Sequence, residues 1–349
     1  MLPLRWRERD PPPMGVLDAV FRRVAAVVPF VVLVALTSLT LTPPAGADPA
    51  MWRAEWPQTD FSRHTVPFGE IRSGGPPKDG IPSIDRPAFK PVGEIADLGP
   101  KEPVITLVVG GEARAYPLRI LTWHEIANDV IAGVPVAVTY CPLCNAAIAF
   151  DRRIDGRTLE FGTTGKLRNS DLVMYDRTTE SWWQQYTGTG LIGAHAGRTL
   201  AMLPTRVESF ERFARRYPTG QVLVPDDPAL RPYGVNPYTG YDTARRPFLY
   251  SGKFPDGIAP MAYVVAVEDE AWALDLLRIK GRIEAGDLVL EWEPGQNSTL
   301  DRPMIADGRD IGNVIVRRRA GATLADTTFH VTFAFVFHAF RPDGRLHTE

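Results

Sequence analysis

The residues best suited to chemistry are Cys141 and Cys144, the two cysteines of the 349-residue chain. Residues 136–140 and 147–151 alternate between apolar and polar side chains as strands do, so the CPLC motif is expected on the turn between two strands. Asn145 suits the left-handed backbone conformation that would close such a turn. Both sulfurs should therefore point the same way.

One interpretation of this pair is thiol–disulfide exchange, which requires that one thiol be activated. Cys141 would attack and Cys144 would resolve the intermediate. His124 would act as base, and Arg168 or Asp171 would tune the site. The substrate would be a thiol, a disulfide or a small oxidant. A thioredoxin-like fold is not expected, because that fold places its motif at a helix N-terminus.

A second interpretation is a metal site, because CPxC followed by a turn residue is typical of a zinc knuckle. With one such pair, the remaining ligands would come from His124, Asp171, Met174 or another chain. Two cysteines, a histidine and a thioether suit copper(I) better than zinc. A third interpretation is a non-catalytic module with a structural knuckle. No cofactor beyond copper or zinc is indicated, since the chain lacks the glycine pattern of nucleotide-binding loops.

Charge and the N-terminal segment bear on partners and location. The 39 Lys and Arg residues nearly balance 41 Asp and Glu residues, which gives no indication of nucleic acid as a partner. Residues 1–47 combine a basic start, an apolar run and the small-residue sequence Ala45-Gly46-Ala47, as a signal peptide does. We expect a secreted or extracytoplasmic protein. Membrane contact is expected only if this segment stays uncleaved as an anchor.

The rest of the chain predicts an α+β fold, mainly antiparallel β with a few short helices, because Pro and Gly punctuate many short strand-like segments. Helices are expected over residues 117–130 and 207–217. We divide the chain into a Pro- and Gly-rich arm (48–103), a β-rich half with the cysteines (104–225), a linker (226–260) and a second β-rich half packed on the first (261–349).

The last third resembles the first, which indicates internal duplication of a β-rich unit. Residues 109–115 (VGGEARA) match residues 267–273 (VEDEAWA). Asp151-Arg152 is likewise echoed by Asp301-Arg302. In the second copy, residues 291–295 (EWEPG) stand where the first has its cysteines, so only one copy would carry thiols.

Four strings carry a resemblance to a known family: WHEIAND (123–129), TYCPLC (139–144), FGTTGKLRNSDLVMYDR (161–177) and FAFVFHAFRPDG (333–344). From about Val104 to its end, the chain resembles the secreted bacterial and archaeal proteins catalogued as domain of unknown function 3179. Some members are catalogued as selenoproteins, so the resemblance implies redox chemistry at the CxxC motif. The chain departs from the family in Asn145, where glycine is usual, and in His338, where an aromatic residue is usual.

Overall fold

The computed structural model describes residues 49–349. The expected signal peptide at residues 1–47 lies outside the described residues. Within residues 49–349, no helix is long and apolar enough to cross a membrane.

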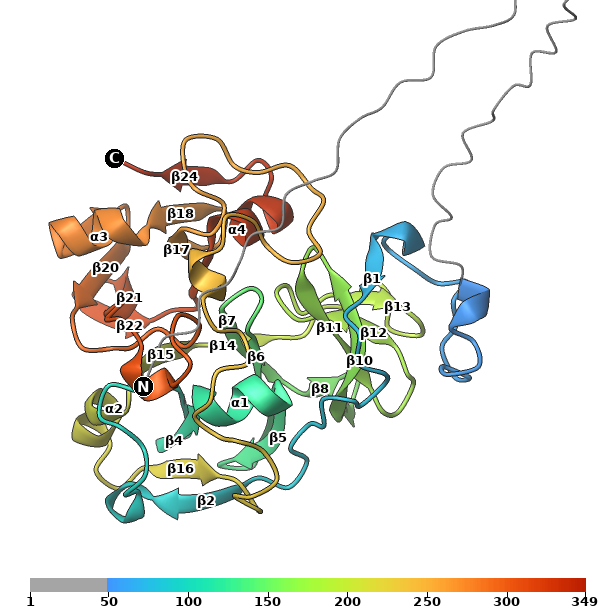
Figure 1. Cartoon of the computed structure of the whole chain (residues 1–349), viewed down its shortest axis with the longest axis horizontal. Helices are drawn as coiled ribbons and strands as arrows, with labels where there is room; N and C mark the ends of the chain where they lie inside the picture. The colour runs from blue at the N-terminus through green and yellow to red at the C-terminus, as the bar shows by residue number, and fades with distance from the viewer. Residues whose placement is uncertain (1–48) are drawn as a thin grey trace, which may run out of the picture. The chain divides into compact units, whose positions relative to one another are not determined.

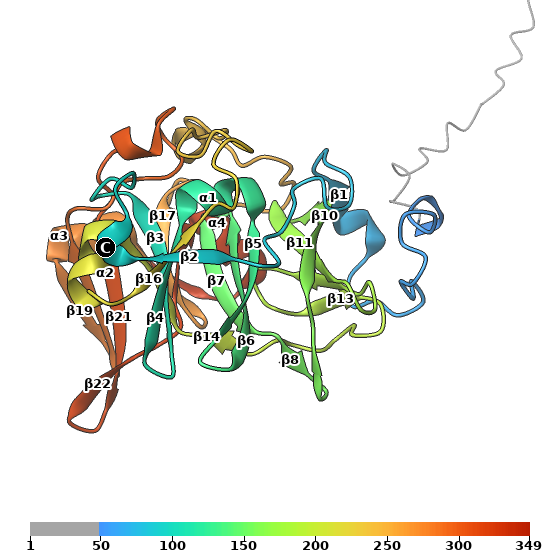
Figure 2. The ribbon, with the colours of Figure 1, turned by 90° about the horizontal axis from the view of Figure 1, so that it is seen from below.

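The fold is mostly β, so the α+β prediction is wrong. Of the described residues, 40% lie in strands and 14% in helices, and five sheets form a propeller-like arrangement. Figures 1 and 2 show that strands predominate over helices in the described part of the chain. The α-helices are two-turn segments of seven residues each, too short to form a layer of their own. They are α1 (Leu118–His124), α2 (Phe210–Arg216), α3 (Leu274–Lys280) and α4 (Ala334–Phe340).

Three sheets come mainly from the first part of the described chain. In strand order, sheet A contains β1 (Ile71–Ser73), β10 (Phe161–Arg168), β11 (Asp171–Asp176), β12 (Trp182–Gln184) and β13 (Gly190–Ile192). Sheet B contains β14 (Met202–Leu203), β7 (Ala146–Asp151), β6 (Val134–Cys141) and β5 (Ile126–Ile131). Sheet C contains β15 (Thr205–Ser209), β3 (Pro103–Val109), β4 (Glu112–Pro117), β16 (Gln221–Val224) and β2 (Ala88–Pro91).

Two further sheets come from the C-terminal part. Sheet D contains β23 (His330–Phe333), β17 (Tyr263–Val267), β18 (Glu270–Ala273) and β24 (Arg345–His347). Sheet E contains β19 (Arg282–Ala285), β20 (Leu288–Glu293), β21 (Asn313–Ala320) and β22 (Thr323–Asp326). The short elements are the pair β8 (Arg153–Ile154) and β9 (Arg157–Thr158), and the 3-10 turns η1 (Pro49–Met51), η2 (Phe68–Glu70), η3 (Val92–Glu94), η4 (Tyr241–Thr243) and η5 (Ile305–Asp307).

The order of elements repeats along the chain. The series β3-β4-α1-β5-β6-β7 recurs as β17-β18-α3-β19-β20-β21, and β14-β15-α2-β16 recurs as β22-β23-α4-β24. Sheet C therefore corresponds to sheet D, and sheet B to sheet E. The echo between Asp151 and Asp301 does not follow this correspondence, because Asp151 ends β7 while Asp301 lies between β20 and β21. A common origin of the two halves stays a prediction.

Several predicted elements have other bounds in the structure. The helix expected over 117–130 ends at His124, because Glu125 takes a left-handed conformation (φ 58°) and the chain continues as β5. The helix expected over 207–217 is α2 alone, since the preceding residues form β15. His338, which stands where an aromatic residue is usual in the family, lies in helix α4.

The largest hydrophobic core joins both repeated parts of the chain. It contains Cys141, Cys144 and Met174 together with Phe333 from β23, all almost fully buried. Phe333 is fully buried and contacts the rings of Tyr241, Tyr263 and Phe335. This core therefore fixes the C-terminal sheets against the sheet that carries the cysteines.

Truncation of Phe333 tests the contribution of this core. We expect Phe333→Ala to lower the free energy of unfolding by about 3–5 kcal/mol, because it removes a fully buried ring and leaves a cavity. Ile279→Ala is the control, since Ile279 is 79% exposed, and we expect a change within about 0.5 kcal/mol. Equal effects of the two variants in urea unfolding would contradict the account.

Candidate functional site

The two cysteines lie on a tight turn between β6 and β7, where the sequence predicts them. Cys141 is the last residue of β6, and the Cys144 amide donates to the Cys141 carbonyl over 3.2 Å. Asn145 closes the turn in the left-handed conformation (φ 48°), and its side-chain amide donates to the Val331 carbonyl at 2.9 Å. The Thr332 hydroxyl donates to the Cys144 carbonyl. The turn is therefore tied to β23 of the second half.

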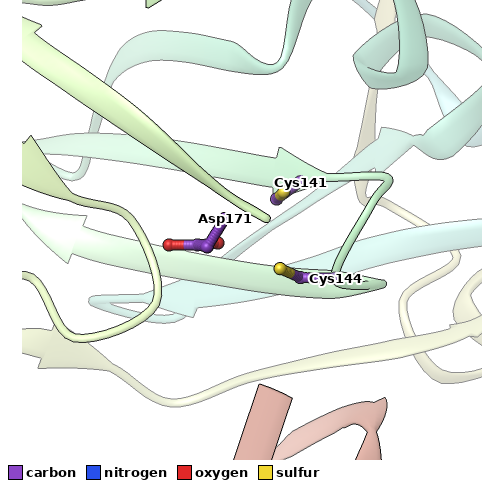
Figure 3. Close-up of side chains that lie close together, drawn as sticks. All are labelled: Cys141, Cys144 and Asp171. Carbon is purple, nitrogen blue, oxygen red and sulfur yellow. The ribbon is translucent and has the colours of Figure 1, made fainter. Parts of the chain in front are cut away.

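The sulfurs of Cys141 and Cys144 are unbridged and 3.8 Å apart. Both thiols point at the Ser170 carbonyl oxygen, at 3.9 and 3.6 Å. Asp171, the first residue of β11, completes the group. Its carboxyl and the two sulfurs lie within 4.8 Å of one another, and Figure 3 shows the three side chains facing one another. We call Cys141, Cys144 and Asp171 the three-residue cluster.

The backbone that presents Asp171 is strained, and the carboxyl group is only half satisfied. Asn169 and Ser170 both have positive φ, 53° and 65°, which residues other than glycine rarely adopt. One oxygen of Asp171 accepts from the Gln184 side chain at 2.6 Å and from the Tyr186 amide at 2.9 Å. Within residues 49–349, the other oxygen and the Ser170 hydroxyl are buried without a hydrogen-bond partner. An unpartnered buried oxygen facing two sulfurs is suited to accept a cation.

The surroundings of the cluster oppose negative charge. Burial raises the pKa of the Cys141 thiol, and the charges of Asp171 and Glu125 add to the effect. Burial and the adjacent Cys141 raise the pKa of the Cys144 thiol further. Burial also raises the pKa of Asp171 from its ordinary value of 3.8 to about 6. In the metal-free cluster the two thiols are therefore held protonated, and Asp171 keeps its proton up to about pH 6.

Glu125 is a further buried acid close to this cluster. It is 7% exposed, and burial, with the charge of Asp171 as a second cause, raises its pKa to about 8. Glu125 also lines a cavity of about 510 Å³ together with Leu143, Leu172, Tyr238 and Tyr241. The three members of the cluster are not among the described residues that line this cavity. Glu125 is thus the acid that lines the cavity and also feels the charge of Asp171.

His124, proposed as the base, is directed elsewhere. One ring nitrogen contacts the Pro82 carbonyl and the other contacts the Tyr233 hydroxyl, both at 2.8 Å. Burial lowers its pKa. Because both nitrogens are engaged away from the thiols, His124 neither activates Cys141 nor joins the three-residue cluster. Glu125 has a left-handed backbone conformation that ends α1. The side chains of His124 and Glu125 therefore point in different directions.

Arg168 and Met174 lie near the cluster without completing it. The Arg168 guanidinium pairs with Glu70 at 2.7 Å and donates to the side-chain amide oxygen of Gln184 at 3.2 Å. It therefore reaches Asp171 only through Gln184, and it stabilises no thiolate directly. Met174 is fully buried in the same hydrophobic core as the cysteines.

The match to a family model covers residues 78–344, and the family is described as a protein of unknown function (DUF3179). The chain belongs to this family. Comparison with curated proteins gives no match, and comparison with solved structures gives none either. The DUF3179 segment includes the whole of the turn, the cluster and the cavity lining from Lys78 onward.

Sequence reasoning missed Glu125, Tyr238 and Tyr241 as parts of the site. The tyrosines lie in the segment that we treated as a linker, and their approach to the cysteines depends on tertiary structure alone. Comparison of the two repeated halves could have indicated Glu125. Helix α3, which corresponds to α1, is followed by Gly281 (φ 68°), and glycine adopts a positive φ without strain. In the first half a glutamate stands at the same position.

The raised pKa values predict how stability depends on pH in the metal-free protein. The folded chain retains the Glu125 proton up to about pH 8, whereas the unfolded chain releases it near its ordinary pKa of 4.5. The contribution of Glu125 to the stability of the fold is fully present below the unfolded pKa of 4.5, and it is lost as pH rises through the folded pKa of about 8. We expect the melting temperature to fall across this window, with a loss on the order of 3 to 5 kcal/mol from Glu125.

Glu125→Gln should remove most of this dependence, because glutamine carries no titrating proton. Thermal unfolding of the chelator-treated parent chain and of the chelator-treated variant at several pH values measures how each melting temperature changes with pH. The same change with pH in the parent chain and in Glu125→Gln would contradict a buried, protonated Glu125.

Proposed function

We propose that the chain is a metal-binding protein whose centre is the three-residue cluster, with zinc as the ion. The observation that carries the proposal is the set of two thiols and one half-satisfied carboxyl, all buried and within 4.8 Å of one another. Thiolates and carboxylates are zinc ligands, and a divalent cation would supply the positive charge that these acids lack.

The separation of the sulfurs fits a zinc ion, and the carboxylate favours zinc over copper(I). Two thiolates at about 2.3 Å from a tetrahedral zinc ion lie about 3.8 Å from each other. The observed separation is 3.8 Å, so the turn needs no rearrangement to hold such an ion. A carboxylate as third ligand also favours zinc, because copper(I) prefers sulfur and imidazole. Three protein ligands leave a fourth position for water or another donor.

Metal analysis of the full chain, purified without chelator or polyhistidine tag, tests this proposal. We expect about one zinc ion per chain. Cys141→Ser, Cys144→Ser and Asp171→Asn should each lower zinc affinity about tenfold or more, because each removes a ligand. Asp176→Asn is the matched control, since Asp176 is a fully buried carboxylate at the other end of the same strand and outside the cluster. Absence of zinc even after reconstitution, or full retention in Cys141→Ser, would contradict the proposal.

A second candidate is thiol redox chemistry, which is favoured by two unbridged thiols on one turn. Oxidation by a disulfide substrate would pass two electrons and two protons to that disulfide, which is reduced to two thiols, and the Cys141 and Cys144 sulfurs would close from 3.8 Å to about 2.05 Å. Against it stand the burial of both sulfurs and the raised pKa values, which oppose the thiolate that exchange requires. Thiol trapping on protein isolated from cells separates the two, because a redox pair yields a disulfide and a zinc centre yields metal-protected thiols.

A further inference from the structure

Glu125 has a backbone conformation that is unfavourable for its residue type. It ends α1 with φ 58° and ψ −29°, whereas Gly281 ends the corresponding helix α3 with φ 68°. A residue with a side chain is strained in this region, whereas glycine adopts it freely. Such strain persists in proteins mainly where the side chain has a use.

The carboxyl group of Glu125 also lacks the partners that a buried acid needs. It is 7% exposed, and in the described part of the chain its side chain has no hydrogen bond or ion pair. Burial of a polar group without a partner is unfavourable. Because Glu125 lines the 510 Å³ cavity, the available partner is a molecule bound in that cavity.

Tyr238 provides a second polar group of the same kind. It lines the same cavity, and among residues 49–349 its hydroxyl has no hydrogen-bond partner. The charge of Glu125 acts on Tyr238, so the two groups lie near each other. The Tyr241 hydroxyl, in contrast, donates to the Leu143 carbonyl and accepts from the Phe248 amide. A mostly apolar cavity with a few convergent polar groups is the usual form of a small-molecule site.

A cationic ligand suits this cavity, because its positive charge would replace the proton that burial otherwise keeps on the Glu125 carboxyl. Lys166 is the basic residue of its described lining, and its ammonium group contacts Glu55 and the Thr164 carbonyl. The lining therefore offers an acid without a matching free cation. An ammonium group donates several hydrogen bonds, and it is attracted to the face of an aromatic ring.

We propose that this cavity binds a small, mostly apolar organic amine. Its ammonium group lies between the Glu125 carboxyl and the Tyr238 hydroxyl, and its apolar body packs against Leu143, Leu172 and Phe248. The site goes beyond the metal centre, because the amine contacts the cavity lining and not the three-residue cluster. It also explains why the first half has Glu125 where the second half has glycine.

Three probes with one ring and different head groups test the proposal: benzylamine, benzyl alcohol and benzoate. Titration calorimetry of the full, metal-loaded chain should give saturable binding of benzylamine, about tenfold tighter than benzyl alcohol. Benzoate should bind most weakly, because its negative charge opposes ionisation of Glu125 and cannot replace the proton on that carboxyl. Glu125→Gln should remove the preference for the amine, and Tyr238→Phe should weaken benzylamine about threefold. Glu211→Gln, an exposed acid on α2, is the control and should leave all three affinities unchanged.

Zinc content is measured in parallel, and it should be unchanged in Glu125→Gln and Tyr238→Phe. Failure of the metal proposal would appear as absence of zinc from the parent chain while benzylamine still binds. The two proposals therefore fail separately. The amine site is overturned by equal affinities for the three probes or by tighter binding of benzoate. It is also overturned by an unchanged amine preference in Glu125→Gln, by loss of zinc in that variant, or by no saturable binding of benzylamine below about 50 mM.

Discussion

The arrangement of the site follows from one constraint, which is that two thiols and a carboxyl are buried together without a positive charge among their contacts. The turn closed by Asn145 holds the sulfurs 3.8 Å apart, and the strained residues before β11 direct Asp171 toward them. In the metal-free chain burial favours the protonated forms of these three groups, since it raises all three pKa values. A divalent cation would exchange those protons for coordination bonds, and burial would then favour the ion.

The repeated order of elements shows what is special about the first half. Both halves build a hairpin, a two-turn helix and an antiparallel sheet in the same order. In the first half, β6 and β7 are joined by the short cysteine turn, whereas residues 294–312 join the corresponding β20 and β21. Glu125 likewise stands where the second half has Gly281. The two departures lie at the same site, so the second half serves as the scaffold that anchors the turn through Val331 and Thr332.

Much of the cluster could be predicted from the sequence, because local signals determine it. Alternation on both sides of CPLC predicts the turn, and Asp171 follows a run of turn-forming residues. His124 was assigned wrongly as the base, because a single left-handed residue after it ends the helix and nothing in the local pattern marks that change. The fold class failed for a similar reason, since apolar spacing indicated helices longer than two turns. Tyr238 reaches the cavity from about a hundred residues away in the chain, and such contacts depend on tertiary packing that one sequence does not reveal.

The central claim is that the two sulfurs and Asp171 bind one metal ion. X-ray absorption spectroscopy at the zinc edge of the full chain, as isolated without chelator, tests it most directly. The account predicts two sulfur atoms at about 2.3 Å and oxygen at about 2.0–2.2 Å from the same zinc ion. A zinc ion surrounded only by nitrogen and oxygen, or a chain without zinc in which the two sulfurs are joined as a disulfide, would contradict it.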